Sequence, residues 1–448
     1  MSSAPPKKLN LFDATMLVMG GIVGIGIFFQ PASVAKEVPL VGPYLLMWVL
    51  GGLVAVAGAM TFAELSGSFP KAGGWYVFLR EAFGAFPAFL FAWIVLFVVS
   101  TGASALVADF CASQFCTMIW GADQAPEGAR MALAAGILIA VTGLALTGIK
   151  RGALFQNLCT LLKLGAIAVL SVAGLAFFDG AAVPIVASAV PAYDGDLMAG
   201  MIRAAMPLLF TFGGWQLVCY IGQHVENPER NLPRSILFGV CGVVIVYLVF
   251  NAAYLRVLGI DGLRSLPDIA GTLAHRTLGS LGGTLLVGAM AISALGLVTA
   301  VIVSTPGLYV AMSDEGLFPR AIGRPHPRTG APSIALCLQC VVALGYLAYG
   351  SERVDKLTTT VVFAEWIFHT LCGLALIRLR YGRPELPRPF RSFAFPLFPV
   401  LYTLIGAAVT LGTLAESPWE ETRTGLIILG IGALIYPLWR RVSGTRAA

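Results

Sequence analysis

The sequence predicts an all-α integral membrane protein with about twelve membrane-spanning helices. Of its 448 residues, 58% are hydrophobic and 12% are charged, about half the charged fraction of a soluble globular domain. The mean hydropathy is +0.84. Apolar runs of roughly 20 residues recur along the whole chain, and each is long enough to cross a hydrocarbon core of about 30 Å as a helix. Only short polar connections separate them, so we expect one membrane domain over residues 1–448.

The apolar runs divide the chain into twelve expected spans. Their bounds are residues 11–36, 41–66, 83–116, 130–149, 154–178, 201–224, 234–258, 281–313, 333–350, 358–380, 393–415 and 422–440. If the N-terminus lies in the cytoplasm, the inner loops hold 19 Lys and Arg residues and the outer loops hold nine. This bias follows the positive-inside rule and predicts an even number of spans. We therefore expect a multi-pass protein in the bilayer of the plasma membrane, with both termini cytoplasmic.

Other classes of protein are disfavoured by the composition and the motifs. The net charge is +6, but the basic residues lie between apolar spans and form no nucleic-acid motif, so no nucleic-acid partner is expected. A nucleophile elbow, a phosphate-binding loop and a metal-ligand cluster are all missing, so we expect no enzyme, no cofactor and no metal site. Cys337 and Cys340 form a C-x-x-C pair inside an apolar span, without the second pair that a zinc site needs.

Two of the spans contain glycine clusters that weaken a helix. Residues 20–26 read GGIVGIG in the first span, and residues 210–215 read FTFGGW in the sixth. Each glycine costs a helix about 1 kcal/mol, and an unwound turn in a membrane is tolerated only where it lines a protein cavity. Interrupted helices at matching positions of two halves predict a transporter's substrate site. The alternative for each cluster is close helix packing through small residues.

The spacing of the two clusters also predicts the organisation of the chain. They lie five spans apart, which predicts a first five-helix repeat over residues 11–178 and a second over residues 201–380, followed by two additional helices in residues 393–440. A broken helix offers bare N–H groups at one end and bare C=O groups at the other, which favour an anion and a cation respectively. One unwound site can therefore recognise the carboxylate and the ammonium of a free amino acid.

Several motifs of the sequence together resemble those of one known family. Residues 24–28 read GIGIF, residues 70–76 read PKAGGWY and residues 210–216 read FTFGGWQ. They are similar to G-S-G-I-F, P-K-A-G-G-x-Y and F-A-Y-G-G-W-N of the amino acid–polyamine–organocation superfamily, and within it the L-type amino acid transporter branch. Residues 226–234 (ENPERNLPR) and 378–391 resemble the family's loops after the sixth and tenth spans. The resemblance covers nearly the whole chain and implies a five-plus-five inverted repeat with discontinuous first and sixth helices.

The resemblance also implies which backbone groups bind the substrate. The amides of Gly24, Ile25 and Gly26 would bind the carboxylate. The carbonyls of Ile22, Phe210 and Gly213 would accept the ammonium, and the Phe210 ring would cover the substrate as a gate.

The chain departs from the family pattern at three positions. Ile25 stands where the family has a serine, so the amide is kept and the hydroxyl is lost. Gly307 replaces an arginine late in the eighth span, and Asp314 replaces the basic residue before Glu315.

Charged residues inside a span are expensive and are candidates for function. Lys163 lies in the middle of the fifth span. It resembles a lysine of sodium-independent members of the family. The ammonium of that lysine occupies the place of the sodium ion in sodium-coupled relatives, between the first and eighth helices. Its alternatives are a structural lysine or a proton-coupling group. Glu365 in the tenth span either acts on the substrate or a proton, or pairs with His369 four residues on. For Glu64 and Lys71 we expect a structural ion pair.

The leading hypothesis is a sodium-independent amino acid transporter that exchanges neutral amino acids by alternating access. Sodium independence is also indicated by Leu297 and Ala300, which stand where coupled relatives tend to be polar. The alternatives are a proton-coupled symporter on the same fold and, from another class, a membrane sensor of amino acids. The sequence leaves open which side chains are accepted and whether a partner subunit exists.

Overall fold

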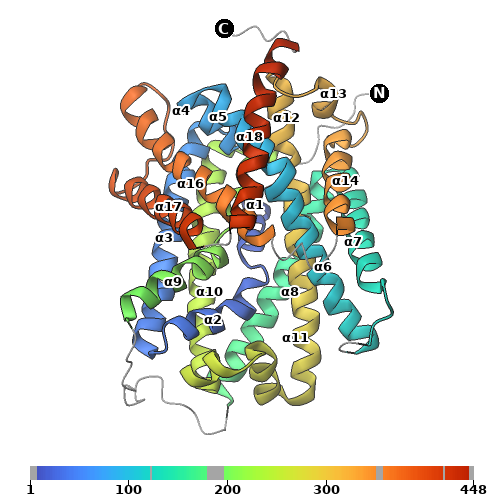
Figure 1. The fold of residues 1–448 in the computed structure, drawn as a ribbon, viewed down its shortest axis with the longest axis vertical. Helices are drawn as coiled ribbons and strands as arrows, with labels where there is room; N and C mark the ends of the chain where they lie inside the picture. The colour runs from blue at the N-terminus through green and yellow to red at the C-terminus, as the bar shows by residue number, and fades with distance from the viewer. Residues whose placement is uncertain (1–7, 122–123, 179–195, 350–356, 417–418, 443–448) are drawn as a thin grey trace.

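The computed structural model describes residues 8–121, 124–178, 196–349, 357–416 and 419–442 (Figure 1). These residues form helices and contain no β-strand; an isolated bridge pairs Leu9 with Val225. The helices are α1 (Leu11–Ile22), α2 (Gly26–Glu37), α3 (Val41–Ser68), α4 (Trp75–Phe83), α5 (Ala85–Ile94), the π-helix η1 (Val95–Val99), α6 (Ser100–Trp120), α7 (Ala129–Leu146), α8 (Ile149–Ala176), α9 (Leu197–Thr211), the 3-10 helix η2 (Trp215–His224), α10 (Pro228–Ser265), α11 (Ile269–Ser304), α12 (Pro306–Asp314), α13 (Arg320–Gly323), α14 (Ser333–Tyr349), α16 (Leu357–Gly382), α17 (Leu397–Glu416) and α18 (Trp419–Val442).

The all-helical membrane fold expected from the sequence is confirmed. In the described part of the chain, eight helical segments are long and apolar enough to cross a membrane, and the bent pair α1–α2 makes up to nine. The apolar helix α14 has 17 residues, slightly fewer than these segments. Helices α16 and α18 lie on the tenth and twelfth expected spans. The protein is therefore a multi-pass membrane protein, and the number of twelve spans stays a prediction.

Both expected helix interruptions are present. α1 begins with a capping box, in which the Asn10 side chain and the Asp13 side chain each accept from the other's backbone N–H. It ends at Ile22, and α2 begins at Gly26 at an angle of 43° to it. In the sixth span α9 ends at Thr211 and η2 begins at Trp215. The discontinuous first and sixth helices are thus confirmed.

Helices at equivalent places of the two expected repeats pack against each other (Figure 1). The second expected span, α3, contacts the seventh, α10; α6 contacts α11, and α7 contacts α14. The halves of the first span contact the halves of the sixth, as α1 with η2 and α2 with α9. This pairing supports two five-helix repeats, whose bounds at residues 11–178 and 201–380 remain predictions.

The buried carboxylate Glu64 corrects one expected ion pair. Instead of pairing with Lys71, Glu64 accepts from Nε and Nη2 of Arg380 at 2.8 and 2.7 Å, and Arg388 lies 3.5 Å away. The backbone N–H of Ser392 donates to the same carboxylate at 2.7 Å. The network joins α3 to α16 and the segment after it. Lys71 follows the same span in the sequence, but the partners of Glu64 come more than 300 residues later, where no local pattern could indicate them.

Candidate functional site

The two interrupted helices meet at a pair of glycines. A Cβ atom built on Gly214 would lie 2.2 Å from the carbonyl oxygen of Gly21, and one built on Gly21 would lie 2.6 Å from the carbonyl oxygen of Gly214. Gly214 also has a φ of +104°, which favours glycine. Only glycine therefore allows the two backbones to approach this closely. The sequence pattern predicted the breaks, and the structure brings them into contact.

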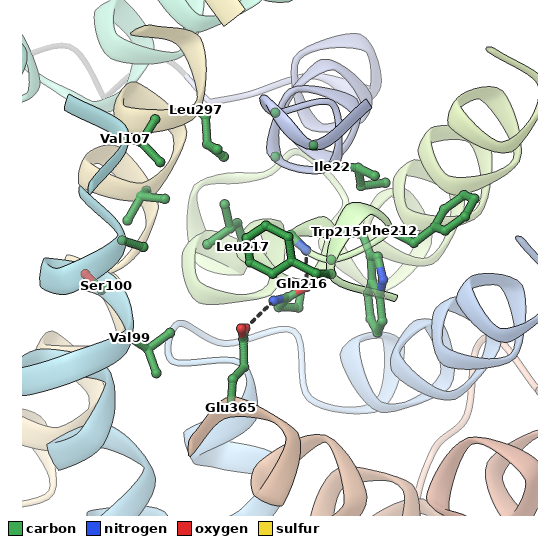
Figure 2. Close-up of a pocket in the computed structure, with 18 of the residues that line it drawn as sticks. Ile22, Val99, Ser100, Val107, Phe212, Trp215, Gln216, Leu217, Leu297 and Glu365 are labelled. Atoms are coloured by element: carbon green, nitrogen blue, oxygen red, sulfur yellow. Dashed lines mark hydrogen bonds between the residues drawn. The ribbon is translucent and has the colours of Figure 1, made fainter. Parts of the chain in front are cut away.

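A cavity of about 180 Å³ lies beside this contact (Figure 2). Its wall comes from the interrupted first and sixth spans, from the third span around η1 and α6, from α11 and from α16. All six residues expected to bind the substrate line it: Ile22, Gly24, Ile25, Gly26, Phe210 and Gly213. The wall is largely apolar, and Figure 2 shows Val99, Val107, Leu217 and Leu297 around the cavity. Concave sites of this kind, with few polar groups, are typical ligand sites.

Unpaired backbone N–H groups lie at the start of α2. Gly24 N–H donates to the carbonyl of Ile22 at 2.8 Å, which closes a tight turn. Among the described residues, no group accepts from the N–H groups of Ile25, Gly26 and Ile27. The positive end of the α2 dipole adds to their attraction for an anion. The arrangement can bind a carboxylate through the backbone, although the Gly24 amide is already engaged within the turn.

The carbonyl groups on the other side of the breaks are partly occupied. Ile22 accepts from Gly24 N–H and from the hydroxyl of Tyr247 at 3.1 Å, and the same hydroxyl lies 3.2 Å from the carbonyl oxygen of Thr211. The carbonyl of Phe210 accepts from Gly213 N–H at 3.2 Å. Tyr247 on α10 therefore joins the carbonyl ends of both interrupted helices. Its signal in the sequence is a phenol within an apolar span, which Tyr254 in the same span shares.

Lys163 lies behind the first break and does not line the cavity. Its ammonium is completely buried and donates to the carbonyl of Gly20 at 2.8 Å and to that of Val23. The hydroxyl of Ser293 on α11 donates to the carbonyl oxygen of Val23 at 3.3 Å and to that of Gly24 at 3.0 Å. The ammonium thus satisfies the carbonyl of Gly20 in the last turn of α1, where a helix leaves acceptors unused, and that of Val23 in the break. Sequence reasoning found Lys163 but missed Ser293.

Glu365 is the one carboxylic acid among the described residues that line the cavity. Its Oε1 accepts from Nε2 of Gln216 at 2.7 Å, while Oε1 of Gln216 accepts from Gly214 N–H at 3.0 Å (Figure 2). The expected neighbour His369 has its Nε2 3.9 Å from the carboxylate, and its Nδ1 bonds to the Tyr402 hydroxyl. The tenth span is therefore hydrogen-bonded to the break of the sixth through Gln216, which sequence reasoning did not single out.

The third span also contributes to the cavity, as expected for a pocket shaped by the third, sixth, eighth and tenth spans, but it does so through a turn that the sequence did not indicate. A π-helical turn, η1, joins α5 to α6 next to the cavity, where Val95, Val99, Ser100 and Ser104 line the wall. Turns of this type are often found at functional sites. The segment reads as an uninterrupted apolar run, so the sequence carries no signal of it.

Two of the departures from the family pattern have a structural reason. Ile25 packs against an apolar cluster between α6, α7, α11 and α14, so its added bulk has a place beside the cavity. A Cβ atom on Gly307 would lie 2.1 Å from the carbonyl oxygen of Tyr220, so α12 packs on η2 without room for an arginine. In the described residues no group of three or more His, Cys, Asp or Glu side chains is placed to hold a metal ion.

The fold and the cavity define a class of protein. Two interrupted helices with a central cavity between them, in a multi-pass membrane protein, are the architecture of a secondary transporter. The sequence model of the family described as amino acid permease matches residues 9–435. The chain belongs to this family, and it is an amino acid transporter and not an enzyme.

Curated relatives match over most of their length. The b(0,+)-type amino acid transporter 1 of Homo sapiens is 29% identical over 446 residues, covering 97% of this chain and 88% of the relative. The large neutral amino acids transporter small subunit 2 of Homo sapiens is 27% identical, with 96% and 78% covered. The serine/threonine exchanger SteT of Bacillus subtilis (strain 168) is 28% identical, with 96% and 95% covered.

Proposed function

We propose that this protein exchanges neutral amino acids across the plasma membrane by alternating access, without sodium. The carboxylate of the substrate binds the free amides of Ile25 and Gly26 at the start of α2, and Gly24 completes the turn that presents them. The ammonium binds carbonyls at the ends of α1 and α9, for which Ile22, Phe210 and Gly213 are the candidates. The largely apolar wall accommodates an uncharged side chain. The similarity to a transporter of large neutral amino acids and to a serine/threonine exchanger supports this proposal.

The observation that carries sodium independence is the position of the Lys163 ammonium. It is hydrogen-bonded to the carbonyls of Gly20 and Val23 at the end of the interrupted α1. These carbonyls are the kind of oxygen ligands that a hard cation such as Na⁺ would use. A second cation at the same oxygens would be repelled by the ammonium at contact distance. The fixed positive charge thus takes the place of a transported one.

Counterflow in proteoliposomes tests the exchange. Purified protein, reconstituted without any other subunit, is loaded with unlabelled serine, and entry of labelled serine is measured with and without the internal substrate. We expect strong stimulation by internal serine and the same rate when sodium is replaced by choline. Equal rates with empty and loaded vesicles would contradict exchange, and a marked loss of uptake in choline would contradict sodium independence.

A proton-coupled symporter is the second candidate, because a carboxylic acid, Glu365, faces the cavity. It makes a different forecast in the same vesicles. Uptake into empty vesicles would then depend on an inward proton gradient and would be abolished by a protonophore, whereas an exchanger would respond to internal amino acid alone.

The orientation is part of the proposal. One side of the membrane would hold 19 basic residues and the other nine, which supports cytoplasmic termini in the plasma membrane. Protease digestion of epitope tags at each end, in intact and in permeabilised cells, tests it: both tags should be cleaved only after permeabilisation.

A further inference from the structure

The wall of the cavity contains a carboxylate that is only half satisfied. Oε1 of Glu365 accepts the hydrogen bond from Gln216. Its second oxygen, Oε2, has no hydrogen-bond partner among the described residues, and the side chain is about one quarter exposed, to the cavity that it lines. His369 does not satisfy it, because its nearest nitrogen is 3.9 Å from Oε1 and its other nitrogen is bound to Tyr402. One acceptor is therefore free inside the transport cavity.

A second polar atom in the same wall is also without a partner. The hydroxyl of Ser104 on α6 is 1% exposed, lines the cavity and makes no hydrogen bond with a described residue. The threonine hydroxyls of the wall differ, since Thr211 donates to Pro207 and Thr305 donates to Val301. A hydroxyl that donates within its own helix is already satisfied. A buried hydroxyl without a partner, such as that of Ser104, costs free energy unless a ligand or water bonds to it.

The orientation of the carboxylate is fixed by the break of the sixth span. Gln216 can offer its oxygen to Gly214 N–H and its nitrogen to Glu365 in only one amide orientation, and both bonds are made (Figure 2). Glu365 is thereby held on the side of the cavity formed by α16, while the free amides of Ile25 and Gly26 belong to the start of α2. The amides that would bind the α-carboxylate of a substrate and the free oxygen of Glu365 therefore lie on different walls of the cavity.

We propose that Glu365 selects the side chain of the substrate: its free oxygen accepts a hydrogen bond from a side chain that ends in a donor, so the transporter prefers such amino acids to apolar ones of the same shape. This inference rests on the proposed amino acid exchange and specifies its substrates. The donor is either a neutral hydroxyl or amide, or a cationic ammonium or guanidinium. An apolar side chain in the closed cavity would remove water from Oε2 without replacing its hydrogen bond. Sites built to bond a donor reject analogues that lack it.

Isosteric substrate pairs test the proposal. Threonine and valine have the same shape and differ in one donor, and lysine and norleucine differ in the terminal ammonium. In proteoliposomes, wild-type protein should transport threonine with a kcat/KM at least about tenfold above that of valine. In Glu365→Leu this ratio should fall to near one, mainly because threonine becomes a poorer substrate. Glu365→Gln keeps the shape, but its oxygen is needed by Gln216 and its NH2 group replaces the free oxygen. It can therefore only donate to the threonine hydroxyl, so it should retain part of the threonine preference and lose any preference for lysine.

Asp261→Asn serves as the matched control, because this carboxylate is exposed at the end of α10, with a side chain 83% exposed. It should leave both ratios unchanged. If Glu365→Leu gives too little folded protein, the substrate ratios of the wild type and of Glu365→Gln still test the proposal. A wild type that takes threonine and valine equally overturns the proposal. Variants of Glu365 that transport threonine and valine more slowly by the same factor also overturn it, because Glu365 would then only stabilise the break of the sixth span. Variants that keep their selectivity but lose a dependence of uptake on the proton gradient overturn it as well.

The outcomes separate this inference from the proposed function. If no amino acid shows counterflow in wild-type vesicles, the proposed exchange is wrong. If lysine is strongly preferred to norleucine and to threonine, the restriction to neutral amino acids is wrong and Glu365 keeps its role. If exchange is robust and the ratios do not depend on residue 365, only the role of Glu365 is wrong.

Discussion

At the scale of single residues, Lys163 is the group whose charge acts on the interrupted first helix. Its hydrogen bonds to Gly20 and Val23 are made by a buried ammonium to carbonyls whose helix has ended. A transporter's inward- and outward-facing states differ by only a few kcal/mol, and a charge shifts them by its differential interaction with the two. One charge-assisted hydrogen bond, about 1.5–3 kcal/mol, is enough for a large shift.

Replacing Lys163 should therefore slow exchange strongly. We expect Lys163→Ala to lower the exchange rate by roughly ten- to hundredfold, while substrate still binds from at least one side. Lys163→Arg should not restore the rate fully, because a planar guanidinium does not fit where a compact ammonium is enclosed. Counterflow and substrate binding are measured on the same purified variants. A wild-type exchange rate in Lys163→Ala would make the lysine structural.

Gly26 is the second residue with a specific forecast. A Cβ atom at this position would already lie 3.2 Å from Oγ1 and 3.3 Å from Cγ2 of Thr211. A leucine side chain would have to enter the cavity, where the substrate carboxylate is expected. Gly26→Leu should therefore abolish binding while the protein still inserts. Gly165→Leu is the control, since that glycine is exposed on α8 and has no neighbour within 4 Å. Wild-type affinity in a folded Gly26→Leu variant would refute the site.

At the scale of elements, the contact between the two breaks decides how the interrupted spans are placed. Gly21 and Gly214 bring α1 and η2 within backbone contact, and a backbone bridge joins the same two elements at their far ends: Leu9 N–H donates to His224 and Glu226 N–H donates to Leu9, both at 2.8 Å. α1 and η2 are thus attached at two points. This geometry favours their movement as one body during the transport cycle.

Gly214→Ala tests the importance of this contact. The added Cβ would lie 2.2 Å from a backbone oxygen, at a residue whose φ is +104°. We expect a loss of stability of at least 1–3 kcal/mol from the strained backbone alone, seen as a lower melting temperature in detergent, together with a lower exchange rate. Gly345→Ala on α14, where a Cβ meets nothing within 4 Å, should melt like the wild type. A Gly214→Ala variant as stable and active as Gly345→Ala would show that the contact is unimportant.

At the scale of the whole molecule, binding should stabilise the fold without help from sodium. A ligand that binds only the folded protein at 100 times its Kd contributes about 2.7 kcal/mol. The melting temperature of the purified protein should rise with a transported amino acid and should be the same in sodium and choline buffers. In Gly26→Leu the rise should disappear. A stabilisation that requires sodium would show a cation site that Lys163 does not replace.

The sequence by itself determined the class of fold and the two helix breaks at which the candidate site is proposed. Apolar runs of membrane length define spans locally, and glycine clusters mark the breaks because glycine lacks the side chain that stabilises a helix. The structure has both breaks where the clusters stand, between Ile22 and Gly26 and between Thr211 and Trp215. The long first span of 11–36 became α1 and α2 for this reason.

The partners of the buried polar groups were decided only by the tertiary structure. Glu64 pairs with Arg380 across more than 300 residues, Glu365 bonds to Gln216 in addition to lying near His369, and Tyr247 reaches both breaks. Hydropathy and glycine content are local properties of one helical turn or one span. A sequence pattern can therefore show that a polar group lies inside a membrane span. Which group satisfies it depends on helix packing and rotation, because several spans present candidates at the same depth and only those that face each other can bond.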